Sequence, residues 1–119
     1  MEHKELVIVL DFVPPTINKY IGRSNIWQYQ EDKKKFHELV MLSTVGINPK
    51  IKKCKMKVVY YFKTRIRHDP GNYDKMLLDG LVHANIIEDD SYEVIQEFTT
   101  IGKYDKMKPR TEVYIHECS

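Results

Sequence analysis

The sequence predicts an α+β fold in which two helices pack on a small mixed sheet, in the order β-α-β-α-β-β. Period-2 alternation and β-branched runs indicate the strands, and apolar stripes at helical spacing indicate the helices. The 119 residues are the size of one domain, so we expect a single domain over residues 1–119. A chain of this length buries enough surface to form a core without disulfides or a structural metal. Strands are predicted at residues 5–13, 54–67, 94–101 and 111–117, and helices at residues 30–45 and 70–84.

The N-terminal third of the chain predicts a strand, a loop and a helix. Residues 5–13 are apolar on both faces, which is typical of an interior strand. A proline-rich loop follows. In residues 30–45 apolar side chains recur at helical spacing, and Gly46 and Pro49 predict the end of this helix. The stripe consists of Phe36, Leu39, Val40 and Ser43.

The segment 54–67 predicts a long strand with one apolar and one basic face. A row of basic side chains with an aromatic residue among them suits a phosphate backbone. Alternatively, this is a solvated sheet face whose lysines discourage pairing with another sheet edge. The basic side chains are Lys55, Lys57, Lys63, Arg65 and Arg67.

The second helix begins with a strong signal. Asp69 is a favoured N-cap residue, and Pro70 suits the first helical position. Asn85 predicts the end of the helix, because asparagine tolerates the left-handed conformation. The apolar stripe between them consists of Tyr73, Met76, Leu77, Gly80, Leu81 and Ala84.

The composition excludes several classes of protein. No apolar run approaches the ~20 residues of a membrane-spanning helix, and the N-terminus has no signal-peptide pattern. Cys54 and Cys118 form no CxxC pair and have no histidine at zinc-ligand spacing, so we expect two free thiols in a cytoplasmic protein. The absence of a Gly-rich phosphate loop, an HExxH helix and a GxSxG elbow argues against nucleotide hydrolysis and against serine or zinc chemistry.

The charges are segregated along the chain, although the net charge is only +2. Residues 39–68 contain eight lysines and arginines and no acidic residue, whereas residues 69–97 contain eight acidic residues and a single base, Lys75. Such segregation indicates either a polyanion-binding surface beside an acidic site or two neighbouring segments that neutralise each other.

Three acidic positions are candidates for a metal site. Asp69 lies where the basic strand gives way to a helix, and residues 88–90 form a triple acid whose mutual repulsion a cation would relieve. Asp79 lies among leucines on the second helix, a turn from Lys75. Hydrolysis of a phosphodiester requires a hard divalent cation, which a few carboxylates can hold. An adjacent lysine can stabilise the charge that develops in the transition state.

Two motifs, PPTINKY at residues 14–20 and RIRHDPGNYDKMLLDGLVHANIIEDDSYEV at residues 65–94, resemble those of the RusA-type Holliday junction resolvases, and the resemblance spans nearly the whole chain. It implies a small Mg²⁺-dependent endodeoxyribonuclease of bacteria and their phages, with Mn²⁺ as the alternative metal. It also implies a homodimer that acts on branched DNA in recombination and repair, because resolving a four-way junction needs two symmetric nicks.

The resemblance also implies roles for individual residues. The metal ligands of the family motif fall on Asp69 and Asp90, its lysine on Lys75 and its asparagine on Asn72. Asp69, Lys75 and Asp90 are therefore the expected catalytic residues, with Lys75 stabilising the charge on the phosphate.

One family carboxylate is missing, because its position falls on Gly71 and glycine cannot bind a metal. We expect another group to complete the site, with Asp79 the first choice, Asp89 the second and Asp74 the third. Alternatively, the protein binds junctions and cuts them poorly.

The expected DNA contacts come from two sources. The N-terminal loop of the family is placed near DNA by the resemblance, and the basic strand face is inferred from the alternation alone. A further alternative is a small protein-interaction domain whose segregated charges serve an acidic partner. The expected DNA-binding residues are Asn18, Lys19, Arg23, Lys55, Lys57, Lys63, Arg65, Arg67 and Asn72.

Overall fold

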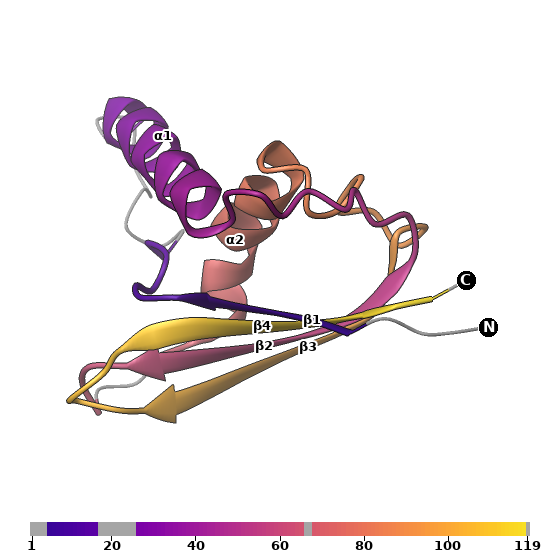
Figure 1. The fold of residues 1–119 in the computed structure, drawn as a ribbon. Coiled ribbons are helices and arrows are strands. Elements are labelled where there is room, and N and C mark those ends of the chain that lie inside the picture. The colour runs from indigo at the N-terminus through magenta and orange to yellow at the C-terminus, as the bar shows by residue number, and fades with distance from the viewer. Residues whose placement is uncertain (1–4, 17–25, 66–67, 119) are drawn as a thin grey trace.

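The computed structural model describes residues 5–16, 26–65 and 68–118, and it consists of a mixed sheet with both helices on one side (Figure 1). The predicted fold class and the predicted order of elements are confirmed. The elements are β1 (Glu5–Leu10), α1 (Ile26–Ser43), β2 (Cys54–Phe62), α2 (Gly71–His83), β3 (Ile95–Tyr104) and β4 (Arg110–Glu117).

The four strands lie in the order β1-β4-β2-β3, so the prediction of an interior strand at residues 5–13 is wrong. β1 is an edge strand that ends at Leu10, and its Val7 and Val9 side chains are exposed. β2 and β3 are parallel because α2 carries the chain back between them, whereas β4 is antiparallel to both of its neighbours. The residues that follow β2 and β3 therefore gather at one end of the sheet. The residues that precede these strands gather at the other end.

The predicted alternation along β2 is confirmed in its first half, and Met56, Val58 and Tyr60 are buried as expected. Val59, predicted on the opposite face, is buried as well. The strand ends at Phe62, five residues earlier than predicted. Its pairing with β4 ends at Tyr61 and its pairing with β3 ends at Phe62, so no partner strand continues beyond that point.

The early end of β2 changes the position of the expected basic row. Lys63 and Arg65 lie beyond the strand rather than on its face, and Arg67 falls outside the described residues. Lys55 and Lys57 lie on the uncovered face, as predicted.

Helix α1 begins four residues earlier and ends two residues earlier than predicted. Its buried stripe is narrower than expected, because Phe36 and Val40 are buried whereas Leu39 and Ser43 are exposed. Gly46 follows the helix with a φ of 82°, a left-handed conformation that favours glycine.

Helix α2 packs closely against α1 through Gly80. A Cβ at this position would lie 3.0 Å from Cε2 of Phe36 and 3.2 Å from Cγ2 of Val40. Four members of the predicted stripe are fully buried (Met76, Leu77, Gly80 and Leu81).

Both ends of α2 bear on the sequence predictions. Asn85 has a φ of 61°, so the predicted left-handed helix stop is confirmed. The predicted N-cap is wrong, because the helix begins at Gly71 with Pro70 as its cap residue and no side-chain cap hydrogen bond. The backbone N–H of Asn72 bonds to the carbonyl of Asp69 instead. The carboxylate of Asp69 is thus not used in capping.

The two cysteines are free, as predicted, and differ in burial. Burial raises the pKa of the Cys54 thiol to about 11, with smaller contributions from the Cys118 and Glu117 charges. We expect the native protein to react with about one equivalent of a thiol reagent at pH 8, through Cys118, and with about two equivalents once unfolded. Two rapid equivalents from the native protein would contradict this assignment.

Candidate active site

Asp69, at the start of α2, has a carboxylate that does not cap the helix. Asp69 is exposed and lies two residues before the first residue of the helix, Gly71. Position 71 adjoins this carboxylate, because a Cβ at Gly71 would lie 3.6 Å from Oδ1 of Asp69 and has no other neighbour within 4 Å. The position where the sequence lacks a carboxylate is therefore beside Asp69, with room for a side chain.

A second carboxylate, Asp74, lies on the same end of α2 and faces the sheet. Its Oδ1 accepts hydrogen bonds from the Tyr60 hydroxyl of β2 at 2.6 Å and from the Thr100 hydroxyl of β3 at 3.1 Å. Burial raises the pKa of Asp74, and the nearby charge of Asp69 adds to the rise, whereas the two hydrogen bonds lower this pKa. Asp69 and Asp74 are thus close enough to interact electrostatically.

Lys75 and Asn72 occupy the first turns of the same helix. Residues three and four positions apart share a helix face, so Asp74 and Lys75 both lie on the side of Gly71. Lys75 is exposed and Asn72 is half-buried. Residues 69–75 therefore carry two carboxylates and an exposed cationic side chain at the start of α2.

Asp90 lies at the opposite end of α2. The helix has 13 residues and so is about 20 Å long, with Asp69 before it and Asp90 seven residues beyond its end. The backbone confirms this placement, because Glu88 donates its N–H to the carbonyl of Ile51 at 2.9 Å, and Ile51 precedes β2 whereas Asp69 follows it. The structure therefore does not bring Asp69 and Asp90 together within one chain.

The first two choices for the missing carboxylate also lie away from Asp69. Asp79 is about 140° around the helix axis from Asp74, and its charge acts on His37 of α1. Asp89 lies in the same distant turn as Asp90. Asp74, the third choice from the sequence, is the carboxylate that the structure brings beside Asp69.

The donor set can be compared with what Mg²⁺ requires. Within residues 5–16, 26–65 and 68–118, no group of three or more His, Cys, Asp and Glu side chains is arranged to hold a metal ion. Asp69 and Asp74 nevertheless supply the carboxylate oxygens that Mg²⁺ favours, and Mg²⁺ often needs only one or two protein carboxylates. The start of α2 therefore offers two carboxylates whose chemistry suits a hard divalent cation.

His68, the residue before Asp69, forms an aromatic wall with Phe62. The His68 ring stacks on Phe62, with centroids 3.9 Å apart and planes inclined by 7°. One ring nitrogen of His68 lies 3.1 Å from the Thr64 hydroxyl, and the other lies 3.1 Å from the Tyr73 hydroxyl. These contacts fix the chain immediately before Asp69.

The same wall borders a hollow of about 350 Å³ with a basic rim. Arg65 lies on this rim with its guanidinium 4.3 Å from the ring centroid of Tyr104. Lys103, near the end of β3, also lines the hollow and is exposed. Two cationic side chains are therefore positioned near the Asp69 end of the sheet.

The uncovered face of the sheet is only partly basic. Lys55 lies 3.7 Å from Glu97, and Lys57 lies over the Tyr114 ring at 4.9 Å. At the Asp69 end of this face, Arg110 stacks 3.7 Å over Tyr61 and forms ion pairs with Asp105 and Glu112. Among these ion pairs, Lys55–Glu97 joins the basic segment 39–68 to the acidic segment 69–97, whereas the pairs of Arg110 belong to neither segment.

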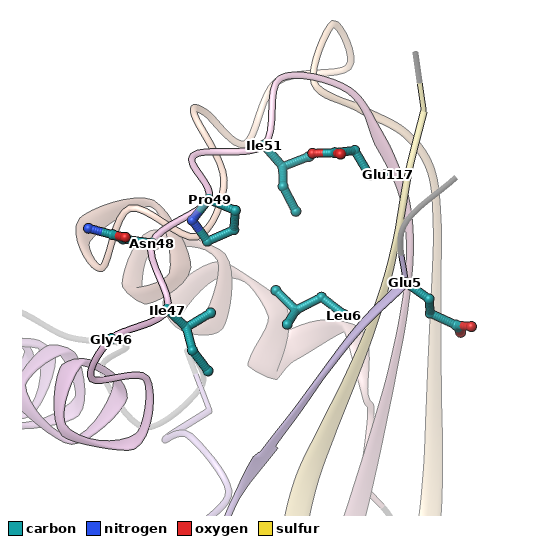
Figure 2. A pocket seen from close by; sticks show the side chains of 8 residues that line it. All are labelled: Glu5, Leu6, Gly46, Ile47, Asn48, Pro49, Ile51 and Glu117. Carbon is teal, nitrogen blue, oxygen red and sulfur yellow. The ribbon is translucent and has the colours of Figure 1, made fainter. Parts of the chain in front are cut away.

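A second hollow, of about 400 Å³, lies at the other end of the sheet (Figure 2). Leu6, Ile47 and Ile51 point into it, whereas the carboxylate of Glu5 points away. Its lining is mainly apolar, and it brings together no set of acids and bases suited to hydrolysis.

Comparison with known proteins decides the family. The family model described as Endodeoxyribonuclease RusA matches residues 12–116. The chain belongs to the RusA family. A search of curated proteins finds no significant match. As a RusA protein the chain is an endodeoxyribonuclease, and its family acts on Holliday junctions and generally depends on a divalent metal. Within the described parts of this RusA chain, no helix is long and apolar enough to cross a membrane.

The structure describes five of the nine expected DNA-binding residues of this RusA protein, including the half-buried Asn72. Lys55, Lys57, Lys63 and Arg65 are exposed, whereas Asn18, Lys19, Arg23 and Arg67 lie outside the described residues. Sequence reasoning missed Lys103, because the third strand was predicted to end at residue 101 and in fact continues to Tyr104. It could not foresee the hydrogen bonds of Asp74, because the positions of Tyr60 and Thr100 relative to α2 depend on the tertiary fold.

Proposed function

We propose that this RusA protein resolves Holliday junctions by paired symmetric nicks in a Mg²⁺-dependent reaction and that it acts as a homodimer. The observation that carries the proposal is the uncommitted Asp69 carboxylate beside Lys75, in a chain whose family is shown. A carboxylate that caps no helix is available to a ligand, and its exposure allows a DNA phosphate to approach.

The residues at the start of α2 have complementary roles in this proposal. Asp69 holds the metal, which when bound would supply a Lewis acid for the phosphate oxygens and an activated water. Lys75 stabilises the negative charge that develops on the phosphate, since it shares a helix face with position 71. Asn72 lies on the first turn of the helix, where it can contact the DNA strand.

Asp90 enters the proposal through a second copy of the chain. Because α2 separates Asp69 and Asp90 within one chain by about 20 Å, both can bind one metal only if they come from different subunits. A twofold dimer would then form two identical sites, each with Asp69 of one subunit and Asp90 of the other. Two sites related by a twofold axis suit the two symmetric nicks that a four-way junction requires.

Positive side chains at the same end of the sheet extend the DNA path. Arg65 and Lys103 border the hollow next to the wall that precedes Asp69. Lys55 lies at the start of β2, about 25–30 Å along the strand from Asp69, and is paired with Glu97. We therefore assign the stronger phosphate contacts to Arg65 and Lys103.

Replacing Arg65 or Lys103 with glutamine is expected to weaken junction binding and to reduce the slope of log K against log salt by about 0.9 per lost phosphate contact. Lys55→Gln is the matched control and should leave the slope nearly unchanged. Titration of a labelled junction at several salt concentrations measures all three variants. A larger slope change from Lys55→Gln than from Arg65→Gln would reverse the assignment of the DNA surface.

Gly71 supports one alternative function, in which the protein binds junctions and cuts them poorly. The two functions differ in the fate of a four-way junction and of a linear duplex with the same sequences, each incubated with Mg²⁺. A resolvase binds and nicks the junction and spares the duplex. A protein of the alternative class binds the junction and leaves its strands intact.

A further inference from the structure

We infer that Asp74 supplies the carboxylate that is missing at Gly71, so that each chain contributes Asp69 and Asp74 to the metal site. The inference rests on the proposed metal-dependent function and names the group that completes its site in this chain. It concerns a residue that sequence spacing alone ranks behind Asp79 and Asp89.

The first step of the argument is position. Position 71 is the neighbour of Asp69, since a Cβ there would lie 3.6 Å from Oδ1 of that residue. Asp74 is three residues further along the helix, which places its Cβ about 5–6 Å from that of position 71 on the same face. A carboxylate group at position 74 can therefore reach the space that a side chain at position 71 would occupy.

The second step is orientation. The hydroxyls of Tyr60 and Thr100 both bond to the same oxygen of Asp74, Oδ1. Neither bond uses Oδ2, so the carboxylate is held by one oxygen and can offer the other to a cation. Carboxylates that bind metals are commonly held in this way by hydrogen-bond donors behind them.

The third step is electrostatic. Asp74 is half-buried and the charge of Asp69 contributes to its raised pKa, so the two carboxylates repel each other and one of them is partly removed from water. A divalent cation between them would relieve both the repulsion and the incomplete solvation. Asp79 has no such relation to Asp69, because it lies toward His37 on the side of α1.

Metal binding by the full-length protein can be measured with Mn²⁺ alone, from the loss of the free-ion signal in electron paramagnetic resonance. Asp74→Asn is expected to weaken Mn²⁺ binding at least about tenfold and to reduce junction cleavage with it. Asparagine keeps an oxygen that can accept from Tyr60 and Thr100, so the melting temperature should change little. Asp79→Asn is the matched control on the same helix and should bind Mn²⁺ as the wild type does.

Restoring a carboxylate at position 71 tests directly whether Asp74 replaces the missing metal ligand. The double variant Gly71→Asp/Asp74→Asn should regain Mn²⁺ binding and cleavage, whereas Gly71→Asn/Asp74→Asn should regain neither. The asparagine variant controls for the loss of glycine in the first turn of α2. Rescue by aspartate alone would show that the two positions supply the same ligand.

Tyr60→Phe keeps the Asp74 carboxylate and removes one of the groups that hold it. The variant should weaken Mn²⁺ binding by about tenfold. If Asp74 had only a structural role, Tyr60→Phe would lower the melting temperature and leave the Mn²⁺ affinity unchanged. Wild-type Mn²⁺ affinity and cleavage in Asp74→Asn would overturn the role of Asp74 alone. Absence of both Mn²⁺ binding and junction cleavage in the wild type and in Gly71→Asp would overturn the proposed function as well.

Discussion

Asp90→Asn is expected to reduce cleavage of a four-way junction by more than about 100-fold, because even residues that only orient metal ligands are worth about 10–100-fold in affinity or activity. The substitution removes one negative charge from an exposed turn, so junction binding should be preserved or slightly stronger. Cleavage is measured on denaturing gels and binding by gel shift, with the same labelled junction.

Glu93→Gln is the control for this variant. Glu93 is an exposed acid three residues further along the same segment, and it has no role in the proposed site. It should cut at nearly the wild-type rate. Full cleavage by Asp90→Asn would remove Asp90 from the metal site, and equal losses in both variants would point to a general effect of charge in this segment.

Mixed dimers of Asp69→Asn and Asp90→Asn subunits are expected to recover nicking that neither homodimer shows. If each site combines Asp69 of one subunit with Asp90 of the other, a mixed dimer has one intact site and one site with both ligands changed. Its nicking rate should approach about half that of the wild type, in one strand per binding event. Purification through two different affinity tags isolates the mixed dimer.

The opposite result is equally clear. If each chain completed its own site, every site in the mixed dimer would lack one ligand, and no nicking would return. The experiment thus distinguishes a shared site from a self-contained one without depending on how the two subunits pack. Its control is a mixed dimer of one wild-type and one doubly substituted subunit, which contains no intact site if sites are shared.

The fold could be predicted largely from the sequence because its signals are local. Alternation along β2 and the stripe of α2 depend on burial of one face, and both patterns persist in the structure. The predicted end of β2 was wrong by five residues, because the alternating side-chain pattern of the sequence continues beyond the point where the partner strands stop. Strand length is set by pairing, which the sequence of one strand does not contain.

The site could be predicted only in part. Spacing along one helix correctly grouped Asp69, Gly71 and Lys75, because neighbours on a helix face follow from its geometry. Asp90 could not be placed in this way, since its distance from Asp69 depends on the path of the chain beyond α2. The surroundings of Asp74 could not be predicted for the same reason, because its two hydrogen-bond donors come from β2 and β3.

The wrong N-cap prediction shows that Asp69 can match the sequence pattern of a helix cap without serving as one. An aspartate followed by proline is a favoured helix start, yet α2 begins at Gly71 without a side-chain cap. In the first turn the backbone N–H of Asn72 bonds to the carbonyl of Asp69 and that of Tyr73 to the carbonyl of Pro70, so the carboxylate of Asp69 has no capping role. Stability of the helix comes instead from its buried stripe and from the close contact of Gly80 with α1.

The central claim is that this protein cuts four-way junctions by a metal-dependent reaction, and strand mapping on a synthetic junction tests it most directly. Each of the four strands is labelled in turn and incubated with the protein in Mg²⁺, in Mn²⁺ and in EDTA. We predict nicks at symmetric positions in two opposing strands with either metal and none in EDTA. Binding of the intact junction without nicks in any condition would contradict the claim and leave a junction-binding protein disarmed at Gly71.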